Sequence, residues 1–228
     1  MSLDRIVCLA NSYKHDHRCV AGISLITKRW LRLVGTKVPG CLTIEETCYR
    51  DGTEASLLDV FEVEIGEPCA SNSHPEDVFI VWQKPWRPVR RFDEPRDIAY
   101  LKGYLNKRPG LLQGYSDRIY VRKFAEAPAS HSLELIEPGD LWWWIREENG
   151  KRRHRALFRL GHVSRARYDL ALTDPRWIER LRPRPAGIYP HASLYDGQPP
   201  PPLLTVSLSE EFEKFHYKLV AGVICLPC

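Results

Sequence analysis

The side chains most suited to chemistry in this sequence are tryptophans and arginines on either side of Asn149-Gly150. An Asn-Gly pair between two runs of strand-forming residues is typical of a two-residue type I′ hairpin. Such a turn fixes the register, so Glu148 should lie opposite Lys151 and every second residue should share a face. One face should be apolar: Trp143, Ile145, Ala156, Phe158 and Leu160. The other should carry Trp142, Trp144, Arg146, Arg153, Arg155 and Arg159.

This second face has the chemistry that single-stranded nucleic acid requires, since bases stack on aromatic rings and phosphates pair with guanidinium groups. The charge pattern agrees with it. Residues 142–184 hold 12 Lys and Arg against five Asp and Glu, a local net charge of +7 in a chain whose total is +4. Cross-strand Trp–Arg ladders also occur as plain surface stabilisation, and this alternative stays open.

A second candidate is the polar segment Asn11-Ser12-Tyr13-Lys14 with Arg18, which we expect to be a loop between two apolar strands. Loops at the rim of a barrel often carry function. Lys14 and Arg18 could bind a phosphate there and Cys19 could act as a nucleophile. This is the alternative of an enzyme that processes a nucleotide or small molecule. The segment could equally be a turn in which Asn11 and Ser12 cap their own backbone.

Metal and cofactor signals are weak. His15, His17 and Cys19 alternate, but a structural zinc needs four ligands and no second closely spaced pair is nearby. Cys225 and Cys228 have the spacing of a redox or zinc pair without a partner pair or a following helix. Phosphate-loop, GxSxG, HExxH and GxGxxG motifs are missing. We therefore expect no metal, no cofactor and no catalysis.

The elements that must position these residues are mostly short strands. In the first part we expect strands at 5–10, 18–26, 29–34, 57–65 and 77–82. A helix is expected at 96–106. Further strands are expected at 140–148, 151–160, 203–208 and 217–225, a short helix opens at Asp174 as its N-cap, and the proline-rich residues 183–202 should form a loop or extended cover.

This pattern predicts a mainly β protein of two small barrels, 1–92 and 129–228, joined by a helical connector at 93–128. The recurrence of Val20-Ala-Gly22 as Val220-Ala-Gly222 suggests an internal repeat. The 228 residues contain no long apolar run and no export signal, and the seven cysteines favour a reducing compartment. We expect a cytoplasmic protein that does not enter a membrane.

Segments along nearly the whole chain resemble the dual-OB-containing domain family of bacterial proteins. The resemblance rests on residues 5–14, 18–22, 30–32, 168–170 with 173–175, 203–208 and 217–224. It implies two OB-like barrels and a role in nucleic-acid recognition or sensing. The implied site residues are Asn11, Ser12, Lys14, Arg18, Trp30, Arg32, Tyr168, Asp169 and Lys218. Leu33 stands where the family pattern has proline, so the backbone beside Arg32 should differ.

We therefore expect a non-enzymatic module that binds single-stranded or structured nucleic acid. Besides the enzyme alternative, a third hypothesis is a protein-interaction module. Its Trp142/Trp144 face would meet a partner protein or a second copy of the chain.

Overall fold

A closed five-stranded barrel forms the first part of the computed structural model, which describes residues 1–228 except 15, 39, 82–83, 161–165, 198 and 227–228. Its strands pair in the order β1-β2-β3-β5-β4, and β4 returns to β1. Among its described strand pairs, only β3 and β5 run parallel. The elements are β1 (Ser2–Lys14), β2 (His17–Ser24), β3 (Trp30–Val34), the 3-10 helix η1 (Glu45–Thr47), β4 (Asp59–Pro68), β5 (Asp77–Ile80) and, beside β4, β6 (Arg87–Arg91).

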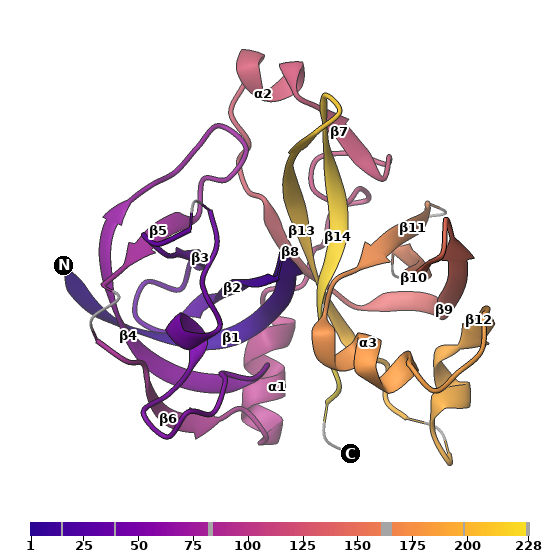
Figure 1. Cartoon of the computed structure of the whole chain (residues 1–228), viewed down its shortest axis with the longest axis horizontal. Coiled ribbons are helices and arrows are strands. Elements are labelled where there is room, and N and C mark those ends of the chain that lie inside the picture. The colour runs from indigo at the N-terminus through magenta and orange to yellow at the C-terminus, as the bar shows by residue number, and fades with distance from the viewer. Residues whose placement is uncertain (15, 39, 82–83, 161–165, 198, 227–228) are drawn as a thin grey trace.

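The second sheet repeats this arrangement with one interruption. The strands that form its barrel pair in the order β9-β10-β11-β14-β13-β8. Only Glu137 separates β8 from β9, so together they act as one bent strand that pairs with β13 at one end and β10 at the other. The strands are β8 (Leu133–Ile136), β9 (Pro138–Glu148), β10 (Lys151–Leu160), β11 (Arg167–Leu172), β13 (Leu203–Phe212) and β14 (Phe215–Ile224). The prediction of a mainly β, two-barrel fold is confirmed (Figure 1).

Along the chain, the segment that connects the two barrels contains α1 (Pro95–Lys102), β7 (Arg118–Tyr120) and α2 (Arg122–Glu126). The expected helix at 96–106 was too long at its C-terminal end. The backbone N–H of Asn106 donates to the Leu135 carbonyl, which ties this residue to β8 instead of to a further helical turn. β7 pairs with β14, so part of the connector belongs to the second sheet.

The proline-rich residues 183–202 differ from the prediction. They contain a strand, β12 (Gly187–Pro190), which pairs antiparallel with β9, and a 3-10 helix, η2 (His191–Leu194). Proline is tolerated there because β12 is an edge strand with one unpaired side. Asp174 caps α3 (Pro175–Leu181) as predicted, accepting from the backbone N–H groups of Arg176 and Trp177.

β1 of the first barrel lies against β14 of the second (Figure 1). Small side chains make this close approach possible: Ala10, Ala21 and Ala221 are all buried in one cluster. Gly22 and Gly222 both sit against β1, but they belong to the second strand of one barrel and the fifth of the other. The two triplets therefore do not occupy equivalent positions, although the two barrels share a strand order, as two similar β units should.

In the described part of the chain, no helix combines the length and apolar character needed to span a bilayer.

Candidate nucleic-acid interface

The β9–β10 hairpin has the predicted register. Glu148 pairs with Lys151, and Asn149 and Gly150 have φ angles of 51° and 69°, as a type I′ turn requires. The five side chains expected to face the core are all buried: Trp143, Ile145, Ala156, Phe158 and Leu160. The alternation that the turn imposes therefore places the remaining tryptophans and arginines outside.

An outward row of arginines follows β10 and is met by one from β11; we call Arg153, Arg155, Arg159 and Arg167 the arginine row. Three of its members lie opposite another arginine: Arg153 faces Arg146 across the hairpin, and Arg159 and Arg167 face each other. Like charges directly opposite each other on a sheet are unfavourable.

Carboxylates neutralise only part of this charge. Arg155 pairs with Asp169, and Arg159 pairs with Asp140 at 3.3 Å. Arg146 pairs with Glu148 at 3.2 Å and lies over the Trp144 ring at 4.8 Å. Among the described residues, Arg153 and Arg167 have no carboxylate within ion-pair distance. Each like-charged pair thus keeps one uncompensated guanidinium, which favours an anionic ligand at both ends of β10.

Trp142 stands beside one end of the row with 41% of its surface exposed. A groove of about 650 Å³ runs next to it, with Leu157 and Ile188 as apolar wall. Its charged lining consists of Arg159, Arg167 and the carboxylates of Asp140 and Asp169. Trp144 is less available, because Ile188 of β12 pairs with it and Arg146 covers its ring. The exposed ring suited to stacking is therefore Trp142.

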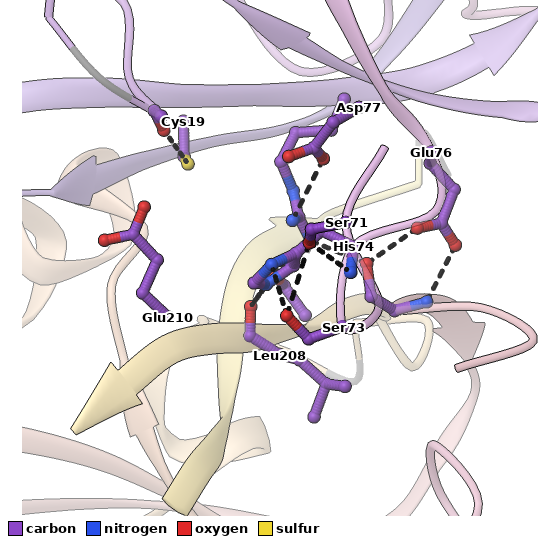
Figure 2. A network of polar contacts seen from close by, with 12 residues as sticks. Cys19, Ser71, Ser73, His74, Glu76, Asp77, Leu208 and Glu210 are labelled. Carbon is purple, nitrogen blue, oxygen red and sulfur yellow. Dashed lines mark hydrogen bonds and ion pairs between the residues drawn. The ribbon is translucent and has the colours of Figure 1, made fainter. Parts of the chain in front are cut away.

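The other end of the row opens into a cleft between the barrels, with a volume of about 610 Å³. Arg153 lines it from the second barrel, and Ser12, Lys14 and Arg32 line it from the first. Figure 2 shows the polar groups gathered here, with Cys19 and Asp77 on the first barrel and Leu208 and Glu210 on β13. We call this cavity the inter-barrel cleft.

Burial controls the ionisation of several groups in the inter-barrel cleft. It lowers the pKa of His74 to about 3, so this imidazole is neutral at pH 7, and its Nε2 lies 3.2 Å from the Leu208 carbonyl. Burial also raises the pKa of Asp77 to about 6, against the opposing effect of Arg32. Burial raises the pKa of Cys19, which keeps the thiol protonated and weighs against the nucleophile hypothesis.

The expected loop at Asn11–Lys14 lies within β1, so alternate residues point in opposite directions. Ser12 and Lys14 line the inter-barrel cleft. Asn11 and Arg18 instead bind Glu54: the Asn11 amide donates to it at 2.9 Å, and two Arg18 nitrogens donate to its two oxygens. The turn alternative does not hold for Asn11, because its Nδ2 donates to Glu54 and to the distant Ala55 carbonyl.

The other residues implied by the resemblance make internal contacts. Arg32 joins the barrels by donating to Ser132 at 2.9 Å and to Ser207 at 3.2 Å. Trp30 packs beside the alanines of the barrel interface. The Tyr168 hydroxyl accepts from the Leu111 N–H and donates to the Gly114 carbonyl.

Lys218 is almost completely buried in β14, where its ammonium donates to the Gly114 carbonyl at 2.9 Å and lies 5.6 Å from the Tyr168 ring centre. Burial lowers the pKa of Lys218 to about 8. The lysine therefore holds the segment around Gly114 against the barrel, and neither of these two partners belongs to the arginine row.

Replacing Lys218 with methionine is expected to change how stability depends on pH. In the native chain the folded lysine releases its proton near pH 8, whereas the unfolded lysine keeps it up to its ordinary value near 10.5. Between those pH values the unfolded chain binds more protons than the folded one, so the contribution of Lys218 to the free energy of unfolding rises with pH. The difference in unfolding free energy between the native chain and Lys218→Met, measured by urea titration, should shift in favour of the native chain across that window. A difference that is constant with pH would contradict this prediction.

His15 and Cys228 lie outside the described residues, and within the described ranges no three metal-ligating side chains form a group. Residues that the sequence reasoning missed include Arg167, Asp140 and Glu210. Arg167 could have been found only by knowing its register with β10, and β11 was not among the expected strands.

Comparison with known proteins identifies the fold family. The model of the dual OB-containing domain family matches residues 4–223, which include all but the ends of the two barrels. No curated protein and no solved structure gives a significant match. Since the family model covers nearly the whole chain, and both sheets have the strand order described above, the chain belongs to the dual OB-containing domain family.

Proposed function

We propose that this protein binds single-stranded nucleic acid along the arginine row of its second barrel. The observation that carries the proposal is the two cross-strand arginine pairs, Arg146–Arg153 and Arg159–Arg167, each with one guanidinium lacking a carboxylate among the described residues. A fold gains nothing from such pairs alone, whereas phosphates bound between them would turn repulsion into attraction.

The dimensions of the row suit a short single strand. From Arg153 to Arg159 the backbone of β10 advances by roughly 20 Å at the usual rise of a strand. OB folds bind about 4–16 nucleotides. Trp142 would stack on one base beside the groove, while the arginines pair with the phosphates. Family membership supports the proposal because OB folds commonly bind nucleic acid, although fold alone does not decide function.

The test is fluorescence anisotropy with labelled single-stranded RNA, single-stranded DNA and duplex at low and moderate salt. Trp142→Ala should weaken single-strand binding about 5-fold to 150-fold, the usual range for loss of one stacked base. Arg153→Ala should reduce the slope of log affinity against log salt by about one, because one phosphate contact is lost.

Two controls match these variants in residue type and exposure. Tyr115→Ala removes an aromatic side chain that is 62% exposed, and Arg96→Ala removes an exposed arginine on α1. Neither should change the affinity. Binding that survives Trp142→Ala unchanged, or no binding of any of the three nucleic acids, would refute the proposal. A concentration-dependent dimer that Trp142→Ala disrupts would instead favour the protein-interaction hypothesis.

A further inference from the structure

The inter-barrel cleft has features that the arginine row does not use. It receives charged side chains from both barrels, and its apolar walls come from Tyr217 and Leu219 on β14. A volume of about 610 Å³ lies within the usual range for small-molecule sites, and a mostly apolar cavity with a few fixed polar groups is typical of them.

Lys14 is the cation in this cleft whose partner is free to leave. Only 17% of its side chain is exposed, and its ammonium donates to the Gly40 carbonyl at 2.7 Å and to Glu210. Glu210 is 56% exposed and reaches across from β13 of the opposite barrel. An exposed carboxylate gains little from such a pair, so a stronger anion can displace it.

Some of the other ionisable groups of the cleft are bound by neighbouring protein groups, and others are free to bind a ligand. Arg32 is fixed by Asp77, Ser132 and Ser207, and His74 is neutral and bonded to the Leu208 carbonyl. Arg153 has no carboxylate partner among the described residues. Once Glu210 moves away, Lys14 and Arg153 present two positive charges from opposite barrels beside Tyr217. Glu211, which also lines the cleft, is an exposed carboxylate.

We propose that the inter-barrel cleft binds a nucleotide through its terminal phosphate, and that Glu210 occupies the place of this phosphate on Lys14 when the cleft is empty. The terminal phosphate could belong to either of two ligands: a free nucleoside monophosphate, or the phosphorylated end of a nucleic-acid strand. The strand source rests on the proposed function, because such a strand would continue along the arginine row. The free nucleotide source does not.

Gly40 is part of this arrangement. It has a φ of 66°, and a Cβ placed on it would overlap Glu210 and lie 2.9 Å from the Lys14 ammonium. The absence of a side chain there lets the lysine and the competing carboxylate meet over the Gly40 backbone. A phosphate could take the space that Glu210 leaves, and it carries more negative charge and more acceptor oxygens than a carboxylate.

The experiment compares phosphorylated with unphosphorylated probes. Adenosine monophosphate and adenosine are titrated by calorimetry, and 3′-labelled single strands with a 5′-phosphate or a 5′-hydroxyl are titrated by anisotropy. The variants are Glu210→Gln and Lys14→Gln. The matched control is Glu213→Gln, which removes an exposed carboxylate from the same β13–β14 hairpin and does not line the cleft.

We expect the native protein to prefer the phosphorylated probe. Glu210→Gln should strengthen that probe's binding by about 3-fold to 10-fold, since a weak competing ion pair and a repulsive charge are both removed. Lys14→Gln should abolish the preference, and Glu213→Gln should change nothing. Because Glu210 is exposed, its variant should fold normally, which a melting curve checks.

Equal binding of the phosphorylated and unphosphorylated members in both probe pairs, or an unchanged preference in Glu210→Gln, would overturn the proposal. Preference in the strands alone would place the phosphate at a strand end and support it. The outcomes are separable from those of the arginine row. Trp142→Ala tests the arginine row, because it should weaken strand binding and leave adenosine monophosphate binding intact. Lys14→Gln and Glu210→Gln test the cleft, because they should change the preference for the phosphorylated probe.

Discussion

Replacement of Arg32 with alanine is expected to lower the free energy of unfolding by about 3–5 kcal/mol at pH 7, the usual cost of removing one partner of a buried ion pair. Arg32 is 5% exposed and lies 3.3 Å from Asp77. It also donates to Ser132 and Ser207 of the second barrel. Its loss leaves the Asp77 carboxylate without its cation and both hydroxyls without a donor.

The cost of Arg32→Ala should depend on pH. Burial already raises the pKa of Asp77 to about 6 in the native protein, and Arg32 opposes this rise. Without Arg32 the pKa of Asp77 should rise further, so the folded variant holds a proton that the unfolded chain has released over a wider pH range. Stability then falls with increasing pH across that range. The deficit relative to the native chain should be smaller at pH 4 than at pH 7.

Urea unfolding at both pH values measures this difference. Arg29→Ala serves as the control, because Arg29 is an exposed arginine just before β3 and forms no ion pair with a carboxylate of the described residues. It should cost little at either pH. A loss of less than about 1 kcal/mol in Arg32→Ala at pH 7 would mean that Arg32 does not join the barrels as described.

Gly222→Ala is expected to lower the free energy of unfolding by about 3 kcal/mol, at the upper end of the usual cost of overpacking. A Cβ on Gly222 would overlap the Leu9 carbonyl oxygen of β1, which also accepts a hydrogen bond from the Thr205 hydroxyl at 2.6 Å. Since the obstacle is backbone and not a flexible side chain, β14 must move away from β1. That movement also disturbs the buried alanines of the barrel interface.

For a chain of 228 residues this corresponds to a fall of roughly 6–12 °C in Tm. Gly66→Ala is the matched control, because a Cβ on Gly66 of β4 would lie 3.6 Å from the Phe79 carbonyl oxygen, an ordinary contact. Its Tm should change by only a few degrees. Equal melting temperatures for the two variants would show that β14 does not need glycine at its approach to β1.

Some features of this protein follow from the sequence by local rules. Asn149-Gly150 determined the register of the β9–β10 hairpin, because a two-residue turn leaves only one pairing of the flanking strands. Alternation then determined which tryptophans and arginines face outward. Asp174 before Pro175 determined the start of α3, since an N-cap side chain acts on residues two and three positions away.

Other features were decided by tertiary structure. Sequence distance says nothing about Glu210 meeting Lys14, or about Arg32 being covered by the second barrel. Asp140 reaches Arg159 because β9 has an irregular register with a φ of 47° at that residue, and β12 pairs beside Trp144. The periodicity of a strand indicates which side chains share a face. It does not indicate what will cover that face, because the covering groups come from segments that approach only when the chain folds.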